Sequence, residues 1–200
     1  MTKEQRERLQ QQLQFILEID KEKNILRQTH LSGHGRREND AEHAWHMTVM
    51  AYLLQEYANE KVDIAHVMIL CLIHDLVEID AGDTYAYDEK GKKTQREREE
   101  RAADRIFGLL PEDQQKLLHA LFEEFDAGQT AEAKFARSMD NLQPLLLNHS
   151  NGGSDWLEHG VSRQTVEKRQ GKTRLGSAVL GELTEEILDA NEEAGHFQKE

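Results

Sequence analysis

The sequence predicts an all-α protein, folded as a single-domain bundle of about 7–9 helices. The 200-residue chain has only two prolines and is rich in Glu, Gln, Leu, Ala and Arg, which favour helix. Apolar residues recur three and four positions apart, the spacing of a buried helix face, and capping patterns precede several of these stretches. No repeat and no Pro-, Gly- or Ser-rich tract divides the sequence into two domains.

The first helix is expected over about residues 3–20. Its stripe of Leu9, Leu13, Ile16 and Asp20 repeats at four, three and four residues. Thr2 and Gln5 have the spacing of a capping box at its start. A polar connection through Gly33 and Gly35 then leads to the second helix.

The second helix is expected to begin near Asn39 or Asp40, either of which can cap it. Its buried stripe is His43, Met47, Met50, Leu54 and Tyr57. A third helix over about residues 63–80 carries the most apolar run of the chain, as expected of a central helix, and contains the pair His74-Asp75.

Further helices are expected over about residues 94–110, from Pro111 onward, and over about 130–148, 155–168 and 183–194. The stretch Gly82–Lys93 is expected to be a loop, after which Thr94 and Glu97 form a second capping box. The glycines in Asn151-Gly152-Gly153 end the helix over 130–148. The inward positions of that helix are Ala133, Ala136, Met139, Asp140, Gln143 and Leu146.

The charge balance restricts the classes of partner. With 25 basic and 38 acidic residues the net charge is −13, the wrong sign for binding long nucleic acids. A small phosphorylated ligand fits better, because a divalent cation and a few local Arg or Lys residues reverse the potential inside a cleft. The single cysteine, Cys71, forms no intrachain disulfide, and no apolar stretch reaches the roughly 18 residues that span a bilayer. The sequence therefore predicts a cytoplasmic protein with no membrane segment.

Four polar residues occupy inward positions of three predicted helices: His43, His74, Asp75 and Asp140. A buried His-Asp pair alone is commonly structural, but His43 and Asp140 also lie on otherwise apolar faces. Two imidazoles and two carboxylates suit an octahedral divalent ion whose coordination is completed by water or substrate oxygens. The expected cofactor is one divalent ion, manganese, cobalt, iron, nickel or zinc, in an open rather than a closed structural site.

This pattern resembles the H…HD…D signature of the HD-domain metal-dependent phosphohydrolases. The strings Ala41-Glu42-His43, His74-Asp75-Leu76-Val77-Glu78 and Ala81-Gly82-Asp83 are similar to those of the bacterial 5′-deoxynucleotidase branch. The resemblance implies an HD-type helical bundle in which residues 1–200 form one domain, with a metal-site core over about 16–148 and C-terminal helices over 155–200 packing on it. It also implies release of phosphate from deoxyribonucleoside 5′-monophosphates, and a homodimer.

The same resemblance implies catalytic roles for Glu78 and Asp83. Glu78 lies one turn beyond His74, so it can align or deprotonate water, or protonate the leaving oxygen. Asp83 shares that work or contacts the sugar. Arg27 matches by position an arginine that precedes the first metal histidine in the family, and its guanidinium is suited to a phosphate.

Three further assignments remain open. Arg36 and Arg37 compete with Arg27 for the phosphate. Gln28 stands where the family members have a tryptophan, which leaves the contact to the nucleobase or sugar open. Tyr85 and Tyr87 either stack on a base or cover the helix end. Residues 148–159 form either a substrate-facing lid or an ordinary connection with a packed tryptophan.

The function favoured is hydrolysis of a small phosphorylated metabolite, most simply a nucleotide, by a metal-activated water. The same ligand set also suits a nucleotide phosphodiesterase or a nucleoside polyphosphate hydrolase. A different class is a non-catalytic binding module that retains the metal. Neither a G-x-S-x-G motif nor a phosphate-binding P-loop motif is present, so covalent hydrolase and P-loop chemistry lack support.

Overall fold

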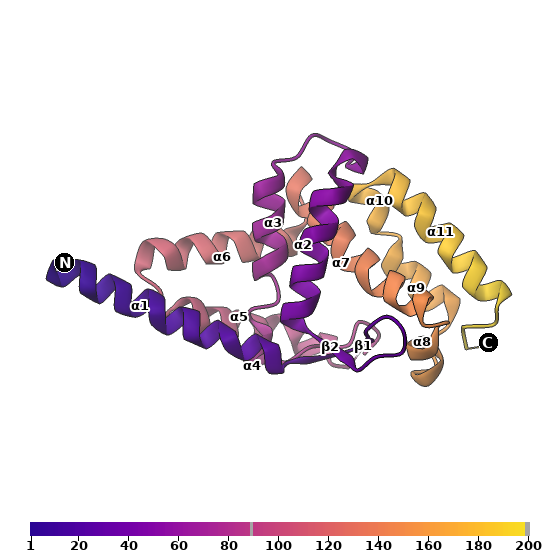
Figure 1. Cartoon of the computed structure of the whole chain (residues 1–200), viewed down its shortest axis with the longest axis horizontal. Coiled ribbons are helices and arrows are strands. Elements are labelled where there is room, and N and C mark those ends of the chain that lie inside the picture. Colours follow the sequence, from indigo (N-terminus) through magenta and orange to yellow (C-terminus); the bar gives the residue numbers. More distant parts are fainter. Residues whose placement is uncertain (89, 199–200) are drawn as a thin grey trace.

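The computed structural model describes residues 1–88 and 90–198. Nine helices of five residues or more lie in this part of the chain, which confirms the predicted all-α class. Figure 1 shows α7 (Ala131–Ser150) running through the middle of the molecule, with α2 (Asp40–Leu54) and α3 (Ile64–Ile73) on one side of it and the C-terminal helices on the other.

The other elements have the following bounds. The helices are α1 (Lys3–Ile19), α4 (Glu78–Ala81), α5 (Lys92–Phe107), α6 (Glu112–Ala127), α8 (Ser154–Glu158), α9 (Arg163–Gln170), α10 (Thr173–Gly176) and α11 (Ala178–Glu193). Two short 3-10 turns, η1 (Asp20–Asn24) and η2 (Gln55–Tyr57), follow α1 and α2, and the strands are β1 (Leu26–His30) and β2 (Arg37–Asn39).

Several helix starts lie where their caps predicted. Thr2 forms a capping box with Gln5 at the start of α1, and Asn39 forms one with Glu42 at the start of α2. The hydroxyl of Thr130 accepts a hydrogen bond from the backbone N–H of Ala133 at the start of α7. These caps satisfy N–H groups that have no partner inside the helix, so local sequence is enough to position them.

The core of the described residues is built around α7. Ala133, Ala136, Met139 and Gln143 are fully buried on this helix, as their spacing predicts. One hydrophobic cluster extends from Phe15 near the amino terminus to Phe197 near the carboxyl terminus. The C-terminal helices therefore share a core with the helices that carry the predicted metal ligands.

The prediction of one continuous helix over residues 63–80 is wrong, because α3 ends at Ile73 and α4 begins at Glu78. The ring Nδ1 of His74 donates to the backbone carbonyl of Cys71, the acceptor that the Asp75 N–H would use in a continuing α-helix. The following N–H groups bond instead to carbonyls three residues back, as in the 2.9 Å bond from Glu78 to Asp75. This tight turn places the His-Asp pair at a helix end.

The polar connection contains a two-stranded antiparallel ribbon that the sequence did not predict. Leu26 pairs with Asn39 and His30 with Arg37, with an irregular register between them. The ribbon is held by the side chain of Asn151, whose amide donates to the carbonyl of Leu31 at 3.0 Å. Contacts between residues far apart in the chain, rather than alternating apolar residues, form these strands.

Three predicted helix boundaries are also wrong. The helix α5 begins at Lys92, and the hydroxyl of Thr94 bonds to the Gly91 carbonyl instead of forming a capping box. The predicted helix over 155–168 is two helices, because the Ser162 hydroxyl caps a new one, and Ser177 starts α11 earlier than 183. Residue 89 of the predicted loop and residues 199 and 200 of the predicted C-terminal region lie outside the described residues.

The helix α1 projects from the body of the molecule (Figure 1). Leu9 and Leu13 of its predicted stripe are 42% and 49% exposed, and Phe15 is its buried residue. The predicted helix is confirmed, but its apolar stripe contacts solvent in the single chain. Within residues 1–88 and 90–198, every helix is too short or too polar to cross a bilayer.

Candidate active site

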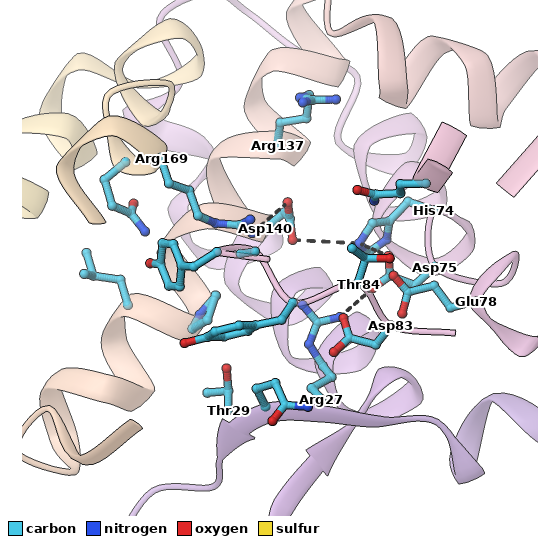
Figure 2. Close-up of a pocket in the computed structure, with 18 of the residues that line it drawn as sticks. Arg27, Thr29, His74, Asp75, Glu78, Asp83, Thr84, Arg137, Asp140 and Arg169 are labelled. Carbon is cyan, nitrogen blue, oxygen red and sulfur yellow. Dashed lines mark hydrogen bonds and ion pairs between the residues drawn. The ribbon is translucent and has the colours of Figure 1, made fainter. Parts of the chain in front are cut away.

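A cavity of about 220 Å³ lies beside α7, between the ribbon, α4 and α9. Figure 2 shows polar side chains entering it from several elements: His74 and Asp75 from the turn after α3, Asp140 from α7 and Arg27 from β1. Glu78 and Asp83 line the same cavity. His43 from α2 contacts Asp140 beside the cavity. Seven residues predicted for the site thus lie at this place or next to it.

His43, His74 and Asp140 form the centre of the site. One ligand atom from each lies within 4.8 Å of the other two. The Nε2 atom of His43 is 3.3 Å from Asp140 Oδ1, and Nε2 of His74 is 4.0 Å from the same oxygen. These atoms come from three elements and converge on one point, which is the arrangement that a metal ion requires.

The orientation of both imidazoles is fixed by their second nitrogen. Nδ1 of His74 donates to the Cys71 carbonyl at 2.9 Å, and Nδ1 of His43 lies 2.9 Å from Oε1 of Gln143. The amide nitrogen of Gln143 donates to Glu38 at 2.7 Å, so its oxygen is left to accept from His43. Both Nε2 atoms of the neutral rings therefore direct a lone pair toward the centre, as in metal-binding histidines.

Asp75 lies beside both imidazoles. Its Oδ1 lies 3.1 Å from Nε2 of His74, and its Oδ2 lies 3.9 Å from Nε2 of His43. Nε2 of His74 is nevertheless a buried atom with no hydrogen-bond partner among the described residues. Because an unpaired buried nitrogen facing carboxylates is costly, a cation at this point would satisfy all four groups.

The electrostatics favour a positive charge at the same point. Burial opposes charge on His74, but Asp75 and Asp140 outweigh it and raise the pKa of His74 to about 8. Burial also opposes charge on Asp140, yet the bond from His43 and the charge of Arg169 hold its pKa well below the ordinary value. A bound metal ion would take the place of the proton on His74.

Arg27 is almost fully buried beside the centre. Its Nη1 donates to Asp75 Oδ2 at 2.8 Å and to Asp40 Oδ1 at 3.2 Å. Burial opposes its charge, but Asp75 and Asp83 raise the pKa of Arg27 well above the ordinary value. Arg27 thus holds one predicted metal ligand in place while it lines the cavity.

The carboxyl groups of Glu78 and Asp83 are largely desolvated and lie near other carboxylates. Burial first, and then the charges of Asp75 and Asp40, raise the pKa of Glu78 well above its usual range. Burial likewise raises the pKa of Asp83. With its pKa raised in this way Glu78 holds a proton more readily than an ordinary glutamate, which suits a general acid.

Arg36 and Arg37 are not brought to the cavity. Arg36 is exposed and bonds to Glu42, and Arg37 extends toward Glu158 at 3.5 Å. Neither lines the cavity, so the prediction that they compete for the phosphate is corrected. Arg36 lies just before β2 and Arg37 is its first residue, and both side chains extend to carboxylates outside the cavity.

Four groups of the site, three buried and one half-buried, were missed by sequence reasoning. Asp40, Glu38 and Gln143 support Arg27 and His43, and Arg169 reaches from α9 to within 3.6 Å of Asp140. The inward position of Gln143 was predicted, but its role was not. The others gave no local signal, because charged residues in a polar stretch ordinarily face solvent.

Residues 148–159 form a packed connection. Trp156 is 2% exposed and stacks on Phe197, and Asp155 accepts hydrogen bonds from the ring and backbone of His30 at 2.6 and 3.0 Å. The rings of Tyr85, Tyr87 and His159 contact one another at the cavity edge. This geometry favours the packed connection over a lid.

Glu22 adds a pH dependence to the stability of this region. Glu22 is 7% exposed, its Oε1 has no hydrogen-bond partner among the described residues, and burial with Asp75 and Asp40 raises its pKa to about 8. The folded protein binds this proton more tightly than the unfolded chain, so its contribution to stability is present below about pH 4.5 and is lost as the pH rises toward 8.

We therefore expect Glu22→Gln to stabilise the metal-stripped protein by about 2 kcal/mol at pH 8.5 and to have little effect at pH 4.5. Urea unfolding at both pH values measures this difference. The exposed residue Glu60 provides the control variant Glu60→Gln, which should shift the midpoint at neither pH. An equal effect of Glu22→Gln at both pH values would contradict the assignment.

Fold and site together define a helical domain with a candidate His/Asp metal centre. The chain belongs to the HD domain family, whose model matches residues 19–179. This membership confirms the resemblance that the sequence motifs indicated.

Solved and curated proteins agree with this membership. A predicted metal-dependent phosphohydrolase from Magnetospirillum magnetotacticum MS-1 is 48% identical, with a TM-score of 0.92 over 96% of each chain. The 5′-deoxynucleotidase HDDC2 of Homo sapiens is 34% identical over 111 residues, 56% of this chain and 53% of the relative. The Bos taurus protein of the same name is 34% identical over 109 residues, 54% of this chain and 52% of its own. The chain thus matches about half the length of these curated relatives.

Proposed function

We propose that this protein is a metal-dependent phosphohydrolase that releases phosphate from small phosphomonoesters, with deoxyribonucleoside 5′-monophosphates as the first candidates. The observation that carries the proposal is the convergence of two oriented imidazoles and two carboxylates beside the buried acid Glu78. The names of the similar proteins, a phosphohydrolase and 5′-deoxynucleotidases, support the same reaction class.

His43, His74, Asp75 and Asp140 would hold one divalent ion in this proposal. The donor set fits manganese, cobalt, iron, nickel or zinc, and the unpaired Nε2 of His74 supports occupancy by a cation. When bound, such an ion supplies a Lewis acid for phosphate oxygens and lowers the pKa of a water molecule. Gln143 and the Cys71 carbonyl keep the two rings in the required tautomer.

The remaining roles fall to the acids and to Arg27. Glu78, buried and surrounded by carboxylates, would move a proton at its carboxyl group, either from water or to the leaving oxygen. Asp83 lines the cavity and would share this work or bind the sugar. Arg27 would position Asp75 and supply a positive charge facing the phosphate.

The test is phosphate release by metal-stripped protein resupplied with manganese, cobalt, nickel, iron, zinc or magnesium. The panel contains deoxyribo- and ribonucleoside monophosphates, sugar phosphates, an aryl phosphate, a nucleoside triphosphate and a phosphodiester. We expect metal-dependent release from nucleoside monophosphates. Turnover of the diester or triphosphate alone would favour the alternative hydrolases, and metal binding without any turnover would favour a binding module.

We also propose that the protein forms a homodimer, as the family resemblance implies. The exposed apolar stripe of α1 supports this, since Leu13 and Leu17 are 49% and 74% exposed, and Leu117 of α6 is 56% exposed. Large exposed apolar areas commonly mark contact surfaces. Sedimentation equilibrium measures the molar mass, and a monomer at all concentrations would contradict the proposal.

A further inference from the structure

A second hollow, of about 1180 Å³, adjoins the metal cavity. The two share Ala86, Tyr87, Arg137, Asp140 and Arg169 in their walls. Figure 2 shows Arg169 reaching Asp140 on the side of the metal centre away from Glu78. The second hollow therefore begins at a predicted metal ligand and leads away from the proposed proton donor.

We call this hollow the basic groove because cationic residues line it. These residues are Lys92, Arg137, Lys168, Arg169 and Lys172. Asp140, Glu167 and Glu185 are the carboxylates of the same wall. This excess of positive charge occurs in a protein whose net charge is −13, so it is opposite in sign to the molecule as a whole.

The carboxylates of the groove do not neutralise its lysines. Glu167 lies 3.4 Å from Arg163, and Glu185 lies 4.0 Å from Arg174, and neither of these arginines lines the groove. The charge of Asp140 belongs to the metal centre. The two anions that could face the lysines are thus already paired elsewhere.

Lys168 and Lys172 are left without a partner. Both are exposed in the groove, and the side-chain ammonium group of neither has a hydrogen bond or ion pair with the described residues. They flank the end of α9, one helical turn apart in sequence, next to Arg169. Arg169 lies 3.6 Å from Asp140, so the basic groove connects directly with the place proposed for the scissile phosphate.

We propose that the basic groove is a second anion subsite, which binds a further phosphoryl group of the same substrate. The preferred substrate is then a small phosphorylated compound that carries two phosphoryl groups, one at the metal centre and one against Lys168 and Lys172. This inference rests on the proposed phosphohydrolase function. Cations in a confined groove suit this ligand, because they interact with each added phosphate charge.

The experiment compares kcat/KM for three substrates: deoxyadenosine 5′-monophosphate, the 5′-diphosphate and the 3′,5′-bisphosphate. We expect kcat/KM for one of the two doubly phosphorylated compounds to exceed that for the monophosphate by about tenfold. The compound with the higher value identifies the position of the second phosphoryl group. In the double variant Lys168→Gln with Lys172→Gln, the ratio of kcat/KM for that compound to kcat/KM for the monophosphate should fall to about one. The ratio should also fall when salt is raised, because exposed charges are screened.

A charge-matched control is Lys61→Gln with Lys116→Gln, which removes two exposed lysines outside both cavities. This variant should keep the ratio of wild type. A wild-type enzyme that prefers the monophosphate, or a ratio that the Lys168 and Lys172 changes leave intact, overturns the subsite.

Measuring binding without turnover distinguishes a failure of the proposed reaction from a failure of the proposed subsite. The same three nucleotides are titrated calorimetrically into metal-loaded Glu78→Gln protein, with and without the two lysine changes. If no compound is hydrolysed but the doubly phosphorylated one binds about tenfold more tightly through the lysines, the subsite stands and the reaction proposal fails. Equal affinities for all three compounds overturn the subsite.

Discussion

Replacing His74 with alanine is expected to abolish stoichiometric metal binding and to lower metal-dependent phosphate release by about 10³-fold or more. The change removes one of two nitrogen donors and leaves Asp75 and Asp140 facing the centre with one imidazole fewer. Because a coordination shell that lacks one nitrogen ligand holds a transition-metal ion less tightly, the site should bind a divalent ion only weakly. Metal content of the purified protein and phosphate release under saturating metal measure the two effects.

The matched control is His66→Ala, on the helix α3 that ends just before His74. The ring of His66 lies 2.8 Å from Glu124 and is away from the cavity, so activity and metal content should change less than about twofold. Circular dichroism establishes that both variants are folded. Full metal occupancy in folded His74→Ala protein would remove His74 from the ligand set.

The second large effect is expected for Glu78→Gln. The side chain keeps its size but can no longer exchange a proton, so kcat should fall by about 10²- to 10³-fold with metal content unchanged. Loss of the buried carboxyl also relieves its repulsion with Asp75 and Asp40, and the variant should be at least as stable as wild type. Phosphate release, metal analysis and thermal unfolding of the same preparation measure these three quantities.

Asp80→Asn provides the comparison for Glu78, since Asp80 lies on the same short helix but pairs with Arg105 away from the centre. It should retain nearly full activity. If Glu78→Gln instead loses metal together with activity, Glu78 is a ligand rather than a proton-transfer residue. If it loses neither, the proton moves through Asp83 or through solvent.

The sequence predicted those structural features that depend only on residues close to one another in the chain. Capping boxes at Thr2 and Asn39 positioned two helices, because a side chain and an N–H three residues apart are sufficient to form them. The apolar spacing of α7 placed Met139 and Gln143 inward for the same reason. The H…HD…D pattern led to the family that the comparison with the family model then confirmed.

Periodicity could not show where the third helix stops. The break after Ile73 depends on the ring of His74 taking the carbonyl of Cys71, a choice that becomes favourable once the ring is buried beside Asp75. The ribbon likewise depends on Asn151, which lies about 120 residues further along the chain. Neither contact can be predicted from the local spacing of apolar residues.

The sequence by itself determined the helical class, most of the helices and the identity of the residues that are candidates for the metal centre, because propensity, capping and motif spacing are local properties. Only the tertiary structure decided which arginines face the cavity, since Arg27 and Arg169 are brought there while Arg36 and Arg37 pair with surface carboxylates. It also decided which acids are buried: Glu78 and Glu22 have raised pKa values because elements distant in sequence exclude water from them and place other carboxylates beside them.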